Sequence, residues 1–511
     1  MKGKRSIALL LMLLMVLLTF AGCGSSGNGG GSGEGEARTN LVIGIGSEPQ
    51  SLDTHYTFDA AAKQVCVQIY DPLVSISDEG QAEPRLAESW TLSEDGLTYT
   101  FKLVENASFT SGRPFNAESA KANLERGLES PYRKSMLKQI KEINVLGEYE
   151  LEIVLSEVYG PFLKGLSALG IVDIEAAEEA GADEFARNPV GTGPYKLKAW
   201  ETGEKVILEA NDDYFRGAPS IKELEFKIIP NSNTMLIALE NGEIDVATDI
   251  DSMDIPDVEA NEALQLKETP MTFVESLLIN CEKEPFNDPL VRRAILMCID
   301  KQSIIDVAFD GRAMIADQPI TPYQYGYSST FKPTERNIEE AKKLLTEAGY
   351  PDGFSCTITA MEGFRKKTAE VIQSNLKEIG ITAEIELLEF GTMLDEGAAG
   401  NFELYVMEAG EGCYEGFYII LYQFHTDLWG EAGNYGRFGN KEMDKLIDAA
   451  PGEVDPEKSL EIYNRIIEIQ DEEAYGVPLF IRYSNIAGNA NLDGLYAHSM
   501  GRVEYYRFSW K

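Results

Sequence analysis

Hydrophobic and polar positions follow two different periods along most of the chain. Alternation with a period of two predicts strand pairs at residues 89–103, with Glu94-Asp95-Gly96 as the turn, and again at 142–155 and 196–209. Apolar positions spaced three and four apart predict amphipathic helices. These helices are expected at residues 116–128, 233–240, 289–308, 337–348, 366–379, 441–450 and 456–475.

Short apolar runs between these segments predict further strands. The first is Leu41–Ile45, and others follow at 221–229, 244–247, 382–388 and 476–480. The strand at 382–388 directly follows a helix that ends at Gly380. Helix, glycine and strand in this order are typical of an α/β lobe.

The N-terminus has a different pattern from the rest of the chain. Met1–Arg5 carries three positive charges, Ile7–Phe20 is an apolar run of 14 residues, and Ala21-Gly22-Cys23 follows. This order is typical of an export signal, and the apolar run is shorter than the roughly 20 residues that span a membrane. The residues before Cys23 resemble a lipobox, which predicts cleavage before Cys23 and a lipid on its sulfur. An ordinary signal peptide that is cleaved nearby is the alternative.

The segment after Cys23 is almost entirely glycine and serine up to Glu36. Such a composition cannot bury a core and behaves as a flexible coil. We therefore predict a tether between a lipid anchor and a folded body that begins near Asn40. With 511 residues, the chain has room for about three folding units at roughly 100–200 residues each.

The overall charge narrows the choice of partners. Asp and Glu number 84 and Lys and Arg 45, which gives a net charge of −39, so nucleic acid is not an expected partner. Six cysteines include no C-x-x-C pair, which leaves zinc-ribbon and thioredoxin sites unsupported. Five cysteines remain once Cys23 is lipidated, and their pairing stays open.

Signatures of catalysis are not found. The sequence contains neither G-x-S-x-G nor H-E-x-x-H, and its three histidines, His55, His425 and His498, do not have metal-ligand spacing. We therefore expect a protein that is not an enzyme and needs no cofactor. A secreted hydrolase is the alternative of another class, and it would need a nucleophile with an activating base.

Four blocks of the sequence are distinctive in combination. They are Tyr70-Asp71-Pro72-Leu73-Val74, the stretch from Pro84-Arg85-Leu86-Ala87-Glu88-Ser89-Trp90 through Phe115, Pro189-Val190-Gly191-Thr192-Gly193-Pro194-Tyr195, and Phe286-Asn287-Asp288-Pro289-Leu290-Val291-Arg292-Arg293-Ala294. Together these blocks resemble the family 5 extracellular solute-binding proteins, which serve ABC importers of peptides, nickel and related solutes. The resemblance covers roughly residues 41–480.

This resemblance implies an α/β fold, namely a two-lobed periplasmic-binding-protein-like clamp of class II, cluster C type, with an additional inserted domain. The expected N-terminal segments are a signal peptide at 1–22 and a lipid-anchored tether at 23–39. In the folded body, lobe I is expected to comprise 40–71, 190–275 and 478–511, the inserted domain 72–189, and lobe II 276–477.

In the family the ligand lies between the lobes, and the resemblance implies contacts from both. Tyr56 and Phe58 follow the first strand. The segment 408–429 contains further candidates, which are Glu411, Tyr414, Tyr418, His425 and Trp429. Peptide-binding members use an aspartate in this segment for the ligand's α-ammonium group, and Glu411 stands at the matching position.

Dipeptide-binding members also use an arginine just ahead of the helix expected here at 366–379, where it holds the ligand's carboxylate. The aligned position is Thr359, and Arg365 lies six residues further on as a substitute. An arginine suits this role because its planar guanidinium forms two parallel hydrogen bonds to a carboxylate.

The resemblance therefore implies a monomeric lipoprotein on the outer face of a bacterial cell membrane. It would capture a peptide or similar small solute and deliver it to the permease and ATPase of an ABC importer. Nickel or a metal chelate is the alternative ligand within the family, with His55 and His425 as the histidines that could approach each other across the cleft. A surface receptor without a transport role is a further alternative.

Overall fold

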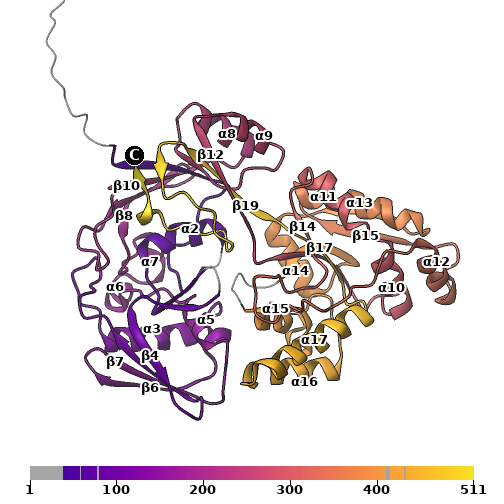
Figure 1. Ribbon diagram of the computed structural model, residues 1–511, viewed down its shortest axis with the longest axis horizontal. Coiled ribbons are helices and arrows are strands. Elements are labelled where there is room, and N and C mark those ends of the chain that lie inside the picture. The colour runs from indigo at the N-terminus through magenta and orange to yellow at the C-terminus, as the bar shows by residue number, and fades with distance from the viewer. Residues whose placement is uncertain (1–37, 58, 78–79, 410–414, 431–432) are drawn as a thin grey trace, which may run out of the picture. The chain divides into compact units, whose positions relative to one another are not determined.

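Strands from separate parts of the chain build a first sheet of seven strands. The computed structural model describes residues 38–57, 59–77, 80–409, 415–430 and 433–511 (Figure 1). The sheet order is β12-β19-β11-β1-β10-β9-β8, and β1 runs parallel to its neighbours β10 and β11. The bounds are β1 Asn40–Ile45, β8 Tyr195–Glu201, β9 Lys205–Ala210, β10 Glu223–Ile228, β11 Val246–Ala247, β12 Leu264–Pro270 and β19 Tyr483–Asn489.

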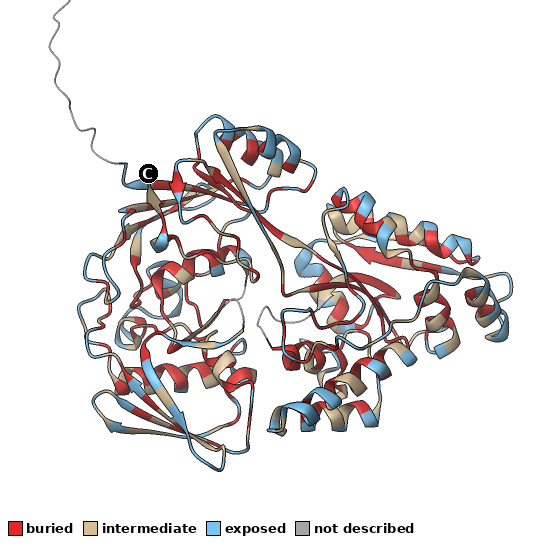
Figure 2. Cartoon of the chain, viewed as in Figure 1, coloured by how far each residue is buried: buried red, intermediate tan, exposed pale blue. Residues whose placement is uncertain are grey.

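Helices and a C-terminal hairpin bury the apolar residues of this first sheet. The core around β1 includes Leu41 and Ile43, both with 0% exposure, and α2 (Ala60–Ile69) contributes Val65 and Ile69. The other elements of this region are α8 Ser232–Glu240, α9 Ile255–Ala260, β20 Leu492–Asp493 and β21 Ser509–Trp510. Figure 2 shows buried residues along the central strands and exposed ones on the outer faces of α8 and α9.

A separate antiparallel sheet of four strands, in the order β4-β5-β7-β6, lies between β1 and β8 in the sequence. The predicted strand pair at 89–103 is confirmed, and Gly96 adopts a positive φ of 73° in its turn. Asn116 caps α3 by accepting a hydrogen bond from the backbone N–H of Ser119, as its side chain predicts. We call this segment, 72–189, the four-stranded region. Its elements are β2 Val74–Ile76, β3 Ala82–Pro84, β4 Ala87–Leu92, β5 Thr98–Leu103, α3 Ala117–Glu129, α4 Lys134–Leu137, β6 Ile140–Gly147, β7 Glu150–Leu155, α5 Phe162–Leu166, α6 Ile174–Ala180 and α7 Ala182–Arg187.

A second large sheet has six strands in the order β14-β18-β13-β17-β15-β16. The helical stretch predicted at 289–308 is a pair of helices, because Asp300 caps α11 and accepts a hydrogen bond from the N–H of Ser303 at 3.1 Å. The elements are β13 Val274–Ile279, α10 Pro289–Cys298, α11 Lys301–Phe309, β14 Met314–Ile315, α12 Ile338–Glu347, β15 Ser355–Ala360, α13 Phe364–Glu378, β16 Thr382–Leu387, α14 Phe390–Ala399, β17 Leu404–Ala409 and β18 Val477–Ile481.

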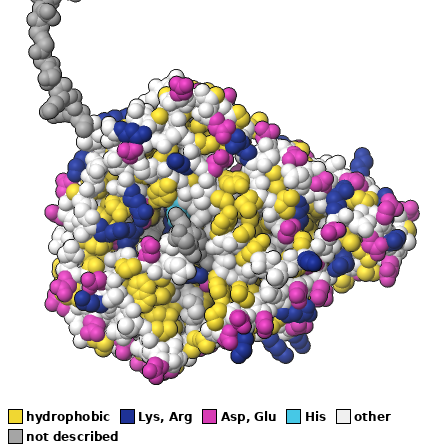
Figure 3. Space-filling model, viewed as in Figure 1, with side chains coloured by type: hydrophobic (Ala, Val, Ile, Leu, Met, Phe, Trp, Pro, Cys, Tyr) yellow, Lys and Arg dark blue, Asp and Glu magenta, His cyan; other side chains and the backbone are white. Residues whose placement is uncertain are grey.

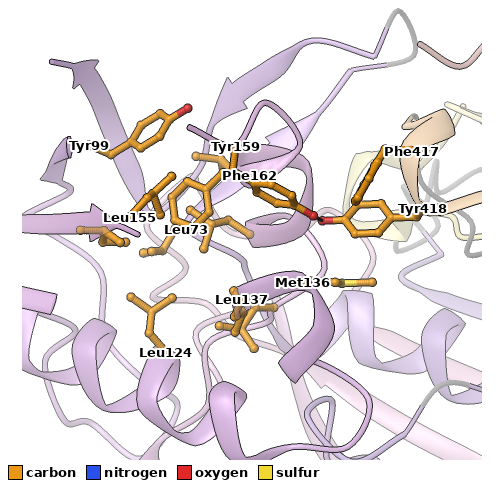
Figure 4. Close-up of a cluster of buried hydrophobic side chains, with 14 of the residues drawn as sticks. Leu73, Tyr99, Leu124, Met136, Leu137, Leu155, Tyr159, Phe162, Phe417 and Tyr418 are labelled. Atoms are coloured by element: carbon orange, nitrogen blue, oxygen red, sulfur yellow. Dashed lines mark hydrogen bonds between the residues drawn. The ribbon is translucent and has the colours of Figure 1, made fainter. Parts of the chain in front are cut away.

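Three more helices, α15 (Gly416–Phe424), α16 (Lys441–Ala449) and α17 (Pro456–Glu472), precede β18. They share one hydrophobic core with the four-stranded region. Figure 4 shows Tyr159 from that region pointing toward Phe417 and Tyr418 of α15, with Phe162 packed on the side of Tyr99. The ring centroids of Tyr159 and Phe417 are 5.8 Å apart, in an edge-to-face arrangement.

Two short segments connect the large sheets. The chain passes from β12 to β13 through residues 271–273 and from β18 to β19 through Arg482 alone. β18 pairs with β13 and β14, and all five of its residues are buried. The sequence placed the last crossing between the lobes at 478. In the structure, the buried run of β18 belongs to the second sheet, and the chain leaves that sheet only at Arg482.

In the described part of the chain, no helix combines the length and apolar character needed to cross a membrane. Acidic and basic side chains are interspersed over the face drawn in Figure 3, with acidic ones spread widely around its edge.

Candidate functional site

Four of the predicted site residues, Cys23, Phe58, Glu411 and Tyr414, lie outside the residues that the structure describes. The others can be placed, and each is found with specific partners.

Tyr56 is held on the loop that follows β1. Its side chain is 40% exposed, and the guanidinium carbon of Arg126 lies 4.8 Å from the centre of its ring. Asp53 fixes that guanidinium through a hydrogen bond from Arg126 Nη1 to Asp53 Oδ1 at 3.0 Å. The ring is therefore both exposed and positioned, which suits a ligand contact.

Three predicted residues from 418–429 contribute to packing and loop structure. Tyr418 has 0% exposure, and its hydroxyl lies 3.2 Å from that of Tyr159. His425 accepts a hydrogen bond at Nδ1 from the N–H of Asp427, and its Nε2 lies 3.2 Å from Asp448 Oδ1. Trp429 donates its Nε1–H to the carbonyl of Phe438 at 2.6 Å. In this arrangement Tyr418 is a core residue rather than one that is open to a ligand.

Arg365, in the first turn of α13, already has a carboxylate partner. Its Nε lies 2.6 Å from Glu275 Oε1, and its Nη2 lies 3.2 Å from Glu275 Oε2. Glu275 sits on β13 with 2% exposure. Burial raises the pKa of the Glu275 carboxyl above its usual value, and the opposing effect of Arg365 offsets that rise only in part. The two-pronged face of this guanidinium is therefore occupied within the protein.

Two more charged residues surround this pair and complete what we call the charged cluster: Glu275, Arg365, Glu408 and Arg482. Glu408 Oε2 lies 3.6 Å from Arg365 Nη2 and 3.7 Å from Arg482 Nη2. Both distances exceed those of direct hydrogen bonds. The side chains of Glu408 and Arg482 are 34% and 27% exposed.

The charged cluster has a defined place in the fold. β15 and β17 are parallel, and α13 begins just after the carboxyl end of β15, while Glu408 is near the carboxyl end of β17. In α/β sheets, ligands bind at this edge. A partly exposed cation and a partly exposed anion therefore face the edge where a ligand is expected, and they match the charged groups of a zwitterion.

Sequence reasoning missed Glu275 and Arg482 as site residues. Glu275 lies in a strand without alternation, and Arg482 follows an apolar run that reads only as a core strand. The only hint in the sequence is that Arg482 comes directly after a predicted buried strand. This position does not by itself distinguish a ligand-binding residue from an ordinary surface residue.

Cysteine and metal chemistry can be assessed for most of the chain. The cysteines with described positions, Cys66, Cys281, Cys298 and Cys356, are free thiols. Burial raises the pKa of Cys281, Cys298 and Cys356 to about 12, which suppresses the reactive thiolate. Within the described ranges, no three His, Cys, Asp or Glu side chains are grouped so that they could hold a metal ion.

Comparison with known proteins gives consistent matches. The family model "Bacterial extracellular solute-binding proteins, family 5 Middle" matches residues 81–430. The glutathione-binding protein GsiB of Salmonella typhi is 27% identical over 471 residues, which cover 89% of this chain and 92% of that protein.

Solved structures show the same overall architecture. The periplasmic binding protein DppA from Helicobacter pylori, in complex with the peptide STSA, has a TM-score of 0.82 and 27% identity, covering 93% of this chain and 98% of that one. The oligopeptide-binding protein AppA from Bacillus subtilis, in complex with a nonapeptide, has a TM-score of 0.81 and 25% identity, covering 93% and 100%.

Proposed function

Because the chain belongs to the bacterial extracellular solute-binding proteins of family 5, we propose that it captures a peptide outside the cell and delivers it to the permease and ATPase of an ABC importer. The predicted family and the predicted α/β fold are both confirmed. The chain is a solute-binding protein of the importer class and not an enzyme.

The observation that carries this proposal is the position of the charged cluster beside the two connections between the large sheets. Arg482 is itself one of those connections. We propose that the first sheet with its helices is lobe I, that the second sheet is lobe II, and that segment 72–189 is the inserted domain. Two lobes joined by short strand connections close around a ligand by bending at those connections.

A peptide is the ligand class that best suits these residues. The termini of a peptide carry one ammonium and one carboxylate at neutral pH, and the partly exposed Glu408 and Arg482 offer one charge of each opposite sign. The names of GsiB, with glutathione, and of the DppA and AppA complexes, with peptides, support the same class.

Native mass spectrometry of the protein purified from its own cells tests the proposal. We expect a bound species with a peptide mass, lost on unfolding and restored when an equimolar mixture of tripeptides is added to the refolded protein. A metal chelate or a sugar as the retained species, together with no uptake of tripeptides, would contradict the peptide assignment.

We also propose that a lipid on Cys23 holds the protein at the outer face of the cell membrane, with residues 24–39 as the tether. Two acyl chains give stable anchoring. Replacing Cys23 by serine is expected to move the protein from the membrane fraction to the medium or periplasm and to abolish incorporation of labelled fatty acid. Unchanged labelling in Cys23→Ser would rule the anchor out.

A further inference from the structure

Arg482 has a guanidinium group that is positioned but not hydrogen-bonded. Its polar neighbour is Glu408 at 3.7 Å, and its other contact is the ring of Phe364, 4.6 Å from the guanidinium carbon. Among the described residues, none accepts a hydrogen bond from this side chain. An arginine has five N–H donors, and the side chain of Arg482 is 27% exposed, so its donors can be offered to a bound molecule.

We propose that Arg482 binds a carboxylate of the ligand, and that Arg365, the arginine expected for that role, serves instead to neutralise Glu275. The inference rests on the proposed function and names a specificity-determining residue for it. Arg365 is unsuited because Glu275 already occupies its Nε and Nη2. A second carboxylate would have to displace the first and leave Glu275, with 2% exposure, without its counter-ion.

Aromatic packing orients the Arg482 side chain without consuming its donors. Phe364 lies beneath the guanidinium, and its own ring is fixed by Phe309 at 5.4 Å and Phe480 at 6.4 Å between centroids. A guanidinium stacked on an aromatic face keeps its edge free for in-plane hydrogen bonds. Arg482 therefore offers a pre-oriented fork, which lowers the entropy cost of binding a carboxylate.

The backbone of Arg482 couples this contact to the movement of the lobes. Ile481, on one side, pairs with Met314 in the second sheet, and Tyr483, on the other, pairs with Pro270 in the first. The carbonyl of Arg482 also accepts a hydrogen bond from the N–H of Met271 at 2.9 Å. In the lobe closure that we propose, a carboxylate bound to this side chain is therefore attached to one of the two connections between the sheets.

The test compares two peptide mixtures on the full-length protein. One is an equimolar set of Ala-Xaa-Ala tripeptides in which Xaa excludes Asp and Glu, so the C-terminal carboxylate is the sole carboxylate of each peptide. The other is the same set with amidated C-termini. Binding is measured by titration calorimetry and by native mass spectrometry. We expect the wild-type protein to bind the free acids at least tenfold more tightly than the amides.

Arg482→Gln is expected to weaken binding of the free acids at least tenfold and to leave binding of the amides within about twofold. Arg482→Lys keeps the charge but lacks the planar fork. Its affinity for the free acids is expected to lie between those of the wild-type protein and Arg482→Gln. It serves as the test if Arg482→Gln does not fold. Arg216→Gln is the matched control, because Arg216 also stacks on a ring, that of Tyr506 at 5.5 Å, and is exposed.

Two results would overturn the inference and leave the proposed function standing: equal binding of acids and amides by the wild-type protein, or an unchanged preference for acids in both Arg482 variants. Binding of neither mixture by the wild-type protein would instead contradict the peptide assignment itself.

Discussion

The imidazole of His55 is held in its neutral form by its surroundings. The ring has 0% exposure, and its Nε2–H donates to the carbonyl of Gly170 at 2.8 Å. Burial, and after it the positive charge of Arg126, lowers the pKa of His55 to about 4. His498 behaves in the same way, with burial as the main cause of a pKa of about 3.

Acidification is therefore expected to destabilise the folded protein. Between pH 6.5 and about 4, the unfolded chain binds a proton on each of these histidines and the folded chain does not, so stability falls as pH falls. The contribution of His55 is about 1.4 kcal/mol per pH unit in this window. Urea unfolding at pH 7, 6 and 5 measures it.

His55→Gln is the matched variant for that measurement, since an amide also donates to the carbonyl of Gly170. We expect its unfolding free energy to depend less steeply on pH than that of the wild-type protein. Equal slopes for the two proteins would mean that His55 does not contribute.

At this scale the sequence identified residue types better than residue roles. An arginine near the start of α13 was expected, and Arg365 is there, but its partner Glu275 lies 90 positions away in the chain. Such long-range contacts decide whether Arg365 or Arg482 is already neutralised by a carboxylate. The spacing of hydrophobic residues along the sequence contains no information about them. For the same reason Tyr418 looked like a ligand contact although it is a core residue.

At the scale of elements, the block Pro189–Tyr195 is a place where the chain passes unusually close to itself. A Cβ atom added at Gly191 would overlap the carbonyl oxygen of Ile69 and the ring of Tyr70, and one at Gly193 would overlap the backbone of Ile69. The carbonyl of Gly191 accepts a hydrogen bond from the N–H of Thr110 at 2.9 Å, which holds this approach in place.

Gly191→Ala is therefore expected to lower the unfolding free energy by about 1–3 kcal/mol, the cost of overpacking a rigid contact. Gly46→Ala is the control, because a Cβ atom there meets no heavy atom within 4 Å. Thermal and urea unfolding of both variants measure the difference, and equal stabilities would contradict the close-approach explanation of this block.

Strands with one exposed face were predicted from the sequence, whereas several that are buried on both faces were not. In each of the pairs β4–β5, β6–β7 and β8–β9, one strand alternates between more and less buried residues, namely β5, β7 and β9. In contrast, all six residues of β13 are buried, and β19 buries polar residues such as Ser484 and Asn485. Strands buried on both faces need not alternate, so a pattern with period two cannot detect them.

At the scale of the whole molecule, the four-stranded region and the helices α15–α17 form a joint contact. Lys164 Nζ lies 3.0 Å from Glu415 Oε2, and the hydroxyl of Tyr463 donates to Glu415 Oε1 at 3.2 Å. The N–H of Gly160 donates to the carbonyl of Pro451 at 2.8 Å. We propose that lobe closure brings these two parts together, so that this contact contributes to ligand affinity.

Lys164→Met is accordingly expected to weaken binding of the tripeptide mixture about tenfold, which corresponds to ~1.4 kcal/mol. Glu415, with 4% exposure, would lose a counter-ion in the closed form. Lys458→Met removes an exposed lysine of α17 and serves as the control. Equal affinities of Lys164→Met and Lys458→Met for the tripeptides would show that this contact does not contribute to ligand binding.

The fold class and the family could be predicted from the sequence. They depend on short sequence blocks in which particular residues are required, such as Gly191 and Gly193, where a Cβ atom would not fit. The boundary near 478 was less accessible, since it depends on which sheet pairs with the buried run of β18. The identity of the bound solute depends on a few side chains that converge from distant positions.

The two connections between the large sheets also limit the kind of motion available. The hydrogen bond from Met271 to Arg482 ties them side by side, so they form a ribbon rather than two independent threads. Such a ribbon can bend across its flat face, while the hydrogen bond opposes sliding of one connection past the other. In the lobe closure that we propose, the two sheets would therefore move relative to each other mainly by bending of this ribbon.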